Sequence, residues 1–310
     1  MKNIFYLLLV CLSSCMQDVP VDKDNVYKTK NVIIVVMDGA RYTETWGHAG
    51  KQYIPRMREL ASEGIVCTSF YNEGLTSTVP GHTAMTTGIY QNINNAGQEI
   101  PSNASIFQQY LFQHKKSSTD AWVFASKDKL EVLSDCLDPA WAGKFRPKTD
   151  CGVNGNHTGY REDSVTFSHL IDTAKKYHPQ IVLVNFKEPD MSGHANNWLG
   201  YVNQIKIIDE YIWKLWNFIE SDDKYKGTTT LIVTNDHGRH SDGIDNGFVS
   251  HWGNCNGCRH IFFFGIGPDF KKNYEDNTYY SQIDIAPTIG KLMSFTIPDA
   301  DGKVMETILK

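Results

Sequence analysis

Acidic residues and histidines gather at three points of the chain, each directly after an apolar stretch. Asp38 follows NVIIVVM, Asp190 lies just past QIVLVNF, and Asp236 with His237 follows TTTLIVTN. One Asp in such a place is well explained as a helix N-cap, because Asp is a favoured cap residue. Three acids in equivalent places, two of them accompanied by histidine, are harder to explain as caps. The pattern therefore indicates a shared metal site.

Histidines extend this pattern to two sets of ligands. Asp190 and His194 are four residues apart in DMSGH, a spacing that lets one turn of the chain present both to one ion. Asp236 and His237 are adjacent, and His251 follows in SHWG. Mixed carboxylate and imidazole ligation suits Zn²⁺ best, with Mn²⁺ or iron as alternatives. Two such sets predict a two-metal site that stabilises the attacking and leaving oxygens of an in-line displacement.

Thr78, in the segment STVPGH, is the candidate nucleophile. Pro80 fits the first position of a helix, so Thr78 is expected just before the positive end of that helix. The helix end, with the backbone N–H groups of Val79 and Gly81, favours an anionic phosphoryl group. A metal ion on the Thr78 hydroxyl would lower its pKa and replace a general base. The alternative is an ordinary threonine cap.

Apolar stretches alternate with amphipathic ones along the chain, which is typical of an α/β protein. Strands are expected at residues 31–37, 64–70, 121–125, 180–186, 228–234 and 260–266, and helices at 55–62, 80–87, 105–115, 162–177, 199–220 and 283–292. Continuous apolarity in the strands predicts a doubly wound, mostly parallel sheet covered by helices on both faces. Ligands bind beyond the carboxyl ends of such strands, where the three acids would converge. The less regular residues 91–156 are expected to form a small lid.

The motifs together resemble those of the alkaline phosphatase superfamily. The segments VVMDGAR, TSTVPGHTAMTTG, EPDMSGH, TNDHG, SHWG and QIDIAPTI occur in the family's order and cover nearly all of residues 31–295. The chain is most similar to the type I phosphodiesterase/nucleotide pyrophosphatase group and to bacterial alkaline phosphatases with a threonine nucleophile. The resemblance implies an alkaline-phosphatase-like fold and a metal-dependent hydrolase of phosphoric esters.

The resemblance also assigns a role to each site residue. It implies that one metal is held by Asp38, Thr78, Asp236 and His237, and the other by Asp190, His194 and His251. It further implies a phospho-threonine intermediate on Thr78. Sulfatases of this superfamily need Cys or Ser followed by x-Pro-x-Arg, a pattern that TVPGH does not match. A second departure is Gly81, where many phosphodiesterases have Asn.

Lys127 and Lys129 follow the expected strand at residues 121–125 and are candidates for substrate binding. Their segment, SKDK, resembles the Lys-Asp-Arg element of threonine-nucleophile alkaline phosphatases, with Lys129 in place of Arg. Phosphonoacetate hydrolases of the superfamily use a lysine pair in this region to hold a carboxylate, so C–P hydrolysis of phosphonates is an alternative function. A solvated charge cluster at the strand end explains the two lysines equally well. Asn92, Asn94 or Asn95 could add a donor.

Composition restricts the partners of the protein. A net charge of −5 without a basic block argues against nucleic-acid binding. The expected partner is a small phosphate ester or phosphonate, and a non-catalytic binding protein has no need for the complete set of ligands together with Thr78. Cys136–Cys151 and Cys255–Cys258 are candidate disulfides, with a zinc knuckle built from all four as the competing interpretation. His240 and His260 are expected to be structural or to support ligands.

The first residues are expected to direct export. Lys2 precedes a short apolar run, and the run ends in LSSC, which resembles the lipobox of bacterial lipoproteins. In those proteins the signal peptidase cuts before the cysteine, here Cys15, which then carries lipid. An ordinary cleavable signal with a chance cysteine is the alternative. The sequence thus predicts a signal at residues 1–15, a tether at 16–30 and a catalytic domain at 31–310, anchored to the bacterial cell envelope.

Overall fold

The computed structural model describes residues 27–310. The expected signal, the lipid-bearing Cys15 and most of the expected tether lie outside the described residues. The tether residues that are described lie against the domain. The carboxylate of Asp269 accepts hydrogen bonds from the backbone N–H of Lys28 at 3.0 Å and of Thr29 at 2.7 Å. Residues 27–30 are therefore part of the packed structure.

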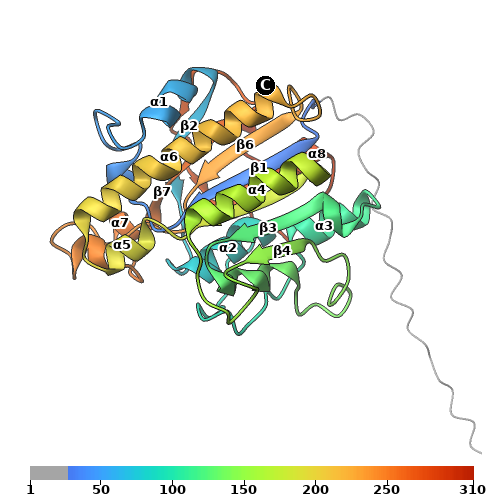
Figure 1. The fold of residues 1–310 in the computed structure, drawn as a ribbon, viewed down its shortest axis with the longest axis horizontal. Coiled ribbons are helices and arrows are strands. Elements are labelled where there is room, and N and C mark those ends of the chain that lie inside the picture. Colours follow the sequence, from blue (N-terminus) through green and yellow to red (C-terminus); the bar gives the residue numbers. More distant parts are fainter. Residues whose placement is uncertain (1–26) are drawn as a thin grey trace, which may run out of the picture.

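A nine-stranded sheet crosses the described part of the chain (Figure 1). Its strands follow the order β4-β3-β5-β1-β6-β7-β2-β8, and β9 pairs with β2. The strands are β1 Asn31–Met37, β2 Gly64–Tyr71, β3 Ala121–Ala125, β4 Lys148–Cys151, β5 Ile181–Phe186, β6 Thr229–Thr234, β7 His260–Ile266, β8 Tyr274–Asp276 and β9 Tyr280–Ser281.

Helices cover both faces of this sheet (Figure 1). They are α1 Pro55–Leu60, α2 Thr78–Thr87, α3 Ile106–Gln113, α4 Asp163–Tyr177, α5 Asp190–His194, α6 Trp198–Ser221, α7 Asn256–Arg259 and α8 Ile285–Met293. One face packs against α1, α4 and α6, and the other packs against α2, α3 and α8. The predicted doubly wound α/β fold is confirmed.

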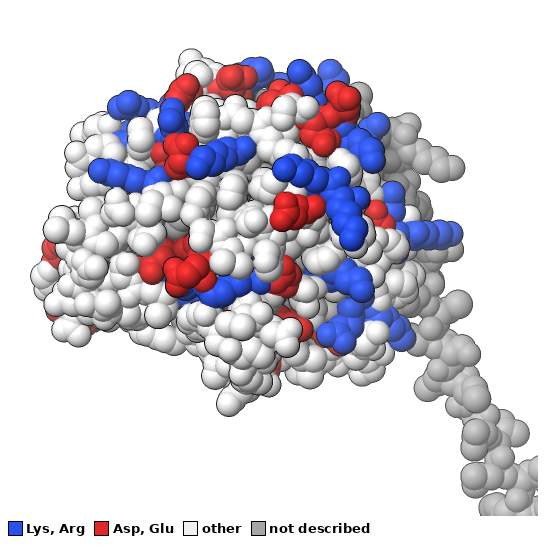
Figure 2. Space-filling view, viewed as in Figure 1, with Lys and Arg blue, Asp and Glu red and all other residues white. Residues whose placement is uncertain are grey.

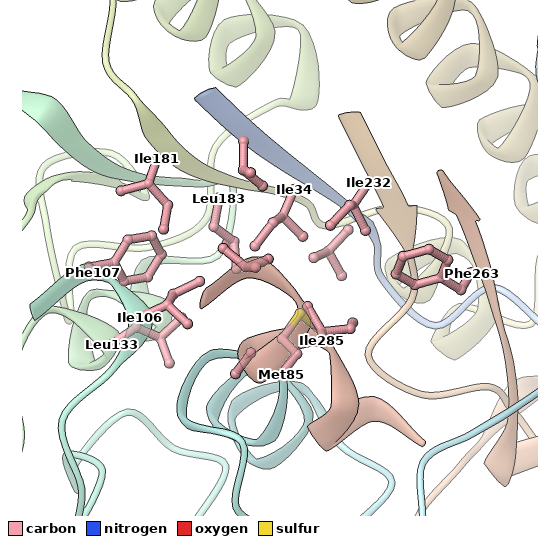
Figure 3. Packing of buried hydrophobic residues seen from close by; sticks show 14 of the residues in the cluster. Ile34, Met85, Ile106, Phe107, Leu133, Ile181, Leu183, Ile232, Phe263 and Ile285 are labelled. Atoms are coloured by element: carbon pink, nitrogen blue, oxygen red, sulfur yellow. The ribbon is translucent and has the colours of Figure 1, made fainter. Parts of the chain in front are cut away.

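Side chains of β1 alternate between the two hydrophobic cores. Ile33 points into the core shared with α1, α4 and α6, whereas Ile34 points into the core shared with α2, α3 and α8. Figure 3 shows Ile34 packed near Met85 of α2, Phe107 of α3 and Ile285 of α8. Because both faces are buried, positions 32–37 of β1 are all apolar, which explains the continuous apolarity of this part of the strand.

The sheet is mixed, and this is where sequence patterns were least informative. β7 runs antiparallel to both β6 and β2, while the other pairings are parallel. Strand direction leaves no trace in an apolar run, because parallel and antiparallel central strands bury the same residues. Strands β4, β8 and β9 and the helices α5 and α7 were also missed, since each has five residues or fewer and is too short to show a period.

The segment 91–156 does not form a separate lid. β3 and β4 belong to the main sheet, where β3 pairs with β5 and with β4, and α3 packs into the core beside α8. The irregular composition of this segment reflects the loops between these elements. The expected lid is therefore corrected to an edge of the central domain.

Charged side chains of both signs are mixed on one face of the described structure. On the face drawn in Figure 2, lysines and arginines are interspersed with aspartates and glutamates, so that face has no continuous basic stripe. Within residues 27–310 no helix combines the length and the apolarity that crossing a bilayer requires.

Candidate metal centre

Four of the predicted side chains come from segments that follow parallel strands. Asp38 directly follows β1, Asp190 begins α5 after β5, and Asp236 and His237 follow β6. β5, β1 and β6 are neighbours and parallel, so their carboxyl ends meet at one edge of the sheet. All four side chains are buried. Sheet order thus brings together residues that are far apart in the chain.

Asp38, Asp236 and His237 form a first group. Nε2 of His237 lies 3.6 Å from Oδ1 of Asp38 and 3.5 Å from Oδ2 of Asp236. Ligand atoms on one tetrahedral zinc ion are about 3.3–3.8 Å apart, given its bond lengths. Among the described residues, Oδ2 of Asp236 and Nε2 of His237 have no hydrogen-bond partner, although both atoms are buried. A buried polar atom without a partner is costly, and one bound cation would satisfy both.

The protonation of this group also suits a cation. Burial, and then the neighbouring Asp38, raise the pKa of Asp236 to about 7. Burial lowers the pKa of His237, so its imidazole is neutral. Nδ1 of His237 lies 2.8 Å from the carbonyl oxygen of Gly238, so Nδ1 carries the proton and Nε2 keeps its lone pair. The donor set therefore fits a divalent metal ion.

Asp190, His194 and His251 meet beside this group. Oδ1 of Asp190 lies 3.4 Å from Nε2 of His194 and 3.7 Å from Nε2 of His251, and the two nitrogens are 3.1 Å apart. Nδ1 of His251 lies 2.7 Å from the carbonyl oxygen of Thr76, so Nε2 again faces the carboxylate. The second expected ligand set is thus brought together. Like that of His237, the pKa of His251 is lowered by burial.

His237 lies between the two sets. Its ring stacks on that of His251 with centroids 4.0 Å apart. Ligand atoms of Asp190, His237 and His251 are all within 4.8 Å of one another, as are those of Asp38, Asp236 and His237. The resemblance assigned His237 to the first set alone, whereas the geometry allows it to serve either.

Thr78 is the first residue of α2, and Ser77 is its N-cap. The helix begins two residues earlier than the sequence predicted, so Pro80 occupies its third position. Proline is tolerated there because the N–H groups of the first turn have no partner within the helix. The Thr78 side chain is buried, at the end of the helix where backbone N–H groups face the site.

Gly81 lies in the first turn of α2 for a steric reason. A Cβ atom at this position would lie 2.6 Å from the backbone carbonyl oxygen of Asp236. The departure from relatives that have Asn here therefore follows from the close approach of α2 to the segment after β6. A side chain at position 81 would push the helix away from that ligand.

Lys127 lies at the centre of the site rather than at its rim. Nζ contacts Oδ1 of Asp38 at 2.8 Å, Oδ2 of Asp190 at 2.7 Å and Oγ1 of Thr78 at 3.1 Å. Burial alone would lower the pKa of Lys127, but Asp190 and Asp38 outweigh it and raise the pKa above its usual value. The ammonium group is therefore a fixed positive charge among the carboxylates.

Lys129 lies next to Lys127 but has a neutral partner. Nζ of Lys129 donates to Oδ1 of Asn95 at 3.0 Å, and the same oxygen accepts from the backbone N–H of Val79 at 2.8 Å. Burial, and then the charge of Lys127, lower the pKa of Lys129 to about 8. Of the three asparagines considered, Asn95 is thus the one that contacts the residue after Thr78.

Two functional neighbours were missed in the sequence. Arg239 contacts Asp190 through Nη1 and, with Lys127, holds the pKa of Asp190 well below its usual range although burial alone would raise it. Asn185 donates to Oδ2 of Asp38 at 2.9 Å. Asn185 had a usable signal, because it is a polar residue within the buried strand IVLVNF. Arg239 had a weaker one, its position two residues after the Asp-His pair.

The cysteines do not form the expected bridges. All five cysteines of the described chain are free. Sγ of Cys151, the last residue of β4, lies 3.7 Å from the carbonyl oxygen of Val123, while Cys136 is buried in a loop. Neither the Cys136–Cys151 nor the Cys255–Cys258 disulfide is present, and the four cysteines do not assemble into one knuckle. Sequence spacing could not decide this, because a bridge depends on the spatial approach of the two sulfur atoms.

Known proteins with related sequences were found over parts of the chain. Bis(5'-adenosyl)-triphosphatase enpp4 of Xenopus laevis is 21% identical over 252 residues, which are 74% of this chain and 51% of the relative. A 2,3-bisphosphoglycerate-independent phosphoglycerate mutase of Antithamnion sp. is 30% identical over 141 residues, 44% of this chain and 26% of the relative. The chain therefore spans between a quarter and a half of these curated relatives.

Solved structures share the fold over most of the chain. A protein in the alkaline phosphatase superfamily from Vibrio parahaemolyticus aligns with a TM-score of 0.66 and 16% identity, over 90% of this chain and 70% of that one. Murine ectonucleotide pyrophosphatase/phosphodiesterase 5 aligns with a TM-score of 0.62 and 14% identity, over 90% of this chain and 100% of that one. The model of the metalloenzyme superfamily matches residues 30–295. The chain thus belongs to the metalloenzyme superfamily, as its resemblance to the alkaline phosphatases predicted.

Proposed function

We propose that this protein hydrolyses phosphoric esters through a phospho-threonine intermediate on Thr78, with two divalent metal ions, most readily Zn²⁺, at the carboxylate and histidine groups. One observation carries the proposal. The Lys127 ammonium contacts the Thr78 hydroxyl, Asp38 of the first group and Asp190 of the second. A hydroxyl group beside two ligand groups and a fixed positive charge has the arrangement that phosphoryl transfer needs.

The proposed reaction uses these side chains in two steps. When bound, the metal ions supply a Lewis acid that stabilises charge on the phosphoryl oxygens and lowers the pKa of the attacking hydroxyl. Thr78 Oγ1 attacks phosphorus, and the bond from phosphorus to the ester oxygen breaks. The leaving group departs with the bonding electron pair and takes up a proton. Water then attacks phosphorus, the bond from phosphorus to Oγ1 breaks and Oγ1 takes up a proton from that water, which releases phosphate or a phosphomonoester and restores the Thr78 hydroxyl.

Lys127 contributes charge and not proton transfer. In the metal-free protein Asp190 and Asp38 outweigh burial, raise the pKa of Lys127 and keep its ammonium group protonated at neutral pH. Metal charge at Asp38 and Asp190 would compensate those carboxylates and leave Lys127 to pair with a phosphoryl oxygen. Lysine acts there as a point charge, without the two-pronged grip of an arginine.

The leaving group has a suitable cavity beside the nucleophile. A cavity of about 380 Å³ is lined by Ser77, three asparagines, Glu99 and Trp252, together with Leu75, Thr76 and Ile93. No lysine or arginine is among these lining residues. This lining favours a neutral or aromatic leaving group over an anionic one. The proposal therefore places a polar aromatic ester among the preferred substrates.

Two chromogenic esters test the proposal. Purified protein loaded with zinc is expected to cleave p-nitrophenyl phosphate or bis-p-nitrophenyl phosphate. Thr78→Ala should lower kcat by about 10³-fold or more, because the nucleophile is removed, while Thr78→Ser keeps a hydroxyl and should retain part of the rate. If neither ester is cleaved with zinc, manganese or magnesium, the proposal is wrong. The ratio of the two rates assigns the enzyme to monoesters or diesters.

Phosphonate hydrolysis is a weaker second candidate. It needs a lysine pair free to hold a substrate carboxylate, and only Lys129, paired with the neutral Asn95, meets that requirement in part. Release of inorganic phosphate from phosphonoacetate at a rate above that of both esters would favour this candidate over ester hydrolysis.

We further propose that the protein is exported and anchored to the cell envelope through a lipid on Cys15. The support is the apolar run that ends in LSSC. Metabolic labelling with a radioactive fatty acid should label the mature protein made from the full-length chain, and Cys15→Ala should abolish the label. Labelling that persists in the variant would contradict the assignment.

A further inference from the structure

A second cluster of metal-binding side chains lies next to the candidate metal centre and takes no part in it. His240, Cys255 and Cys258 each offer one ligand atom, and the three atoms lie within 4.8 Å of one another. His240 and Cys258 are buried, and Cys255 is partly exposed. The cluster combines a C-x-x-C pair with a histidine from a different segment, which the sequence spacing did not reveal.

The separations within this cluster match those of metal ligands. Nδ1 of His240 lies 3.4 Å from Sγ of Cys255 and 3.4 Å from Sγ of Cys258, and the two sulfur atoms are 3.6 Å apart. On a tetrahedral zinc ion, two thiolates are about 3.8 Å apart, and a thiolate and an imidazole nitrogen about 3.6 Å, given bond lengths of about 2.3 Å and 2.0–2.1 Å. Three ligand atoms thus already surround a space of the right size.

The imidazole of His240 is oriented for this role. Its other nitrogen, Nε2, lies 3.3 Å from Oδ2 of Asp245. Metal-binding histidines commonly donate their second N–H to a carboxylate, which fixes the tautomer and leaves the ligating nitrogen unprotonated. The contact with the Asp245 carboxylate favours a proton on Nε2, which leaves the lone pair of Nδ1 toward the two sulfur atoms.

The surrounding backbone holds the ligands in place. Burial raises the pKa of both thiols, but at Cys255 hydrogen bonds, first that of the Ser241 N–H, outweigh it and lower the pKa to about 7. At Cys258 burial outweighs the N–H of Gly253 and raises the pKa to about 12, so this thiol loses its proton only when a metal binds. The chain at Gly253 passes so close that a Cβ atom there would lie 2.5 Å from Cε1 of His240. The cluster is therefore packed and not a chance meeting of surface residues.

We propose that His240, Cys255 and Cys258 bind one zinc-like divalent ion, separate from the ions of the catalytic centre, with a solvent molecule as fourth ligand. Binding would release the two thiol protons, since zinc binds thiolates. Thiolate ligation favours a soft or borderline metal such as zinc over magnesium or manganese.

The position of this site gives it a structural role. The segment after β6 holds Asp236, His237 and His240. Further along the chain, His251 precedes α7, Cys255 is the N-cap of α7 and Cys258 lies within it. At present the backbone N–H of Gly238 donates to the carbonyl oxygen of Cys258 at 2.8 Å. An ion between His240 and the cysteines would join the same two segments by stronger bonds. It would thereby fix the distance between the ligands His237 and His251.

Cobalt substitution tests this proposal independently of the hydrolase activity. The catalytic ligands are carboxylate, imidazole and hydroxyl groups, so they cannot give a thiolate-to-cobalt charge-transfer band. Full-length protein, reduced, stripped with a chelator and titrated with Co²⁺, should show such a band. Cys255→Ser and Cys258→Ser should each abolish it and lower the zinc content by one equivalent per chain. Cys136→Ser is the matched control and should leave both unchanged.

Alkylation of the wild-type protein gives a second test, which does not depend on the folding of any variant. In zinc-loaded wild-type protein the partly exposed Cys255 should resist alkylation, and a chelator should make it reactive, as peptide mass spectrometry would detect. Absence of the charge-transfer band, or equal alkylation with and without zinc, would overturn the proposal. So would a disulfide-linked peptide joining Cys255 to Cys258 in protein isolated without reductant.

Discussion

Replacing Asp236 by asparagine should stabilise the metal-free protein and remove one metal ion from the loaded protein. The change keeps the shape of the side chain. Oδ1 still accepts from the backbone N–H groups of Gly39 at 3.1 Å and His237 at 3.0 Å. The new amide nitrogen replaces Oδ2, which has no partner, and faces Nε2 of His237 at a distance of 3.5 Å. Nε2 of His237 can accept a hydrogen bond from the new amide group.

The magnitude follows from the pKa of Asp236. Its pKa is raised from 3.8 to about 7, by burial and then by Asp38. The folded protein therefore holds a proton that the unfolded chain loses above pH 4. The contribution of this proton to the free energy of unfolding is therefore complete below pH 4, and it is lost as the pH rises to 7. Each pKa unit corresponds to about 1.4 kcal/mol, so the loss is on the order of 4 kcal/mol. Asparagine is neutral at every pH, so the Asp236→Asn variant does not lose this free energy of unfolding.

Thermal unfolding at pH 8 with a chelator provides the assay. At roughly 2–4 °C per kcal/mol for a domain of this size, Tm of the metal-free variant should exceed that of the wild type by several degrees. With zinc the order should reverse, because a ligand is lost. Asp209→Asn is the control for metal content, since Asp209 is a buried carboxyl group whose pKa burial also raises to about 7, yet it lies outside the metal groups. Both oxygens of Asp209 accept backbone N–H bonds, so no rise in Tm is expected for this variant. Metal content should change only for Asp236→Asn. A lower Tm of the metal-free Asp236→Asn variant, or undiminished zinc binding, would refute the reasoning.

Three further predictions concern the residues around Thr78. Lys127→Met leaves Asp38 and Asp190 without their shared cation, so the metal-free protein should lose about 3–5 kcal/mol and zinc should restore much of it in thermal melts. Burial lowers the pKa of Lys129 to about 8, so its ammonium group is charged below that pH. KM for an anionic ester should therefore rise as the pH passes 8. A KM that does not change with pH in Lys129→Met would verify that Lys129 causes the rise. Trp252 is 60% exposed at the edge of the leaving-group cavity, where its ring can stack on a nitrophenyl group. Trp252→Ala should therefore raise KM for p-nitrophenyl esters more than it lowers kcat. An unchanged KM would exclude stacking between Trp252 and the leaving group.

Much of the fold could be predicted because its signals are local. The strands β1, β3 and β7 have the predicted bounds, and β2, β5 and β6 differ from them by one residue. Their apolarity results from burial on both faces, which acts on each residue separately. The direction of β7 and the short strands β4, β8 and β9 were missed, because strand pairing depends on partners distant in sequence.

The start of α2 shows the limit at the level of a single residue. Pro80 signals a helix start, but it fits any position of the first turn. The sequence therefore left the boundary open by two residues. In the structure the helix starts at Thr78, so that the candidate nucleophile itself stands at the helix end that faces the site.

By itself the sequence determined the candidate ligands and nucleophile, because parallel strands present whatever follows them at one edge of the sheet. Asp38, Asp190 and Asp236 could be selected on that rule alone. Only the tertiary structure decided their neighbours. It placed Lys127 between two carboxylates, and it brought His240 to a cysteine pair that lies beyond the next loop. The physical reason is that strand order and loop packing set distances between side chains, whereas the sequence records only their separation along the chain.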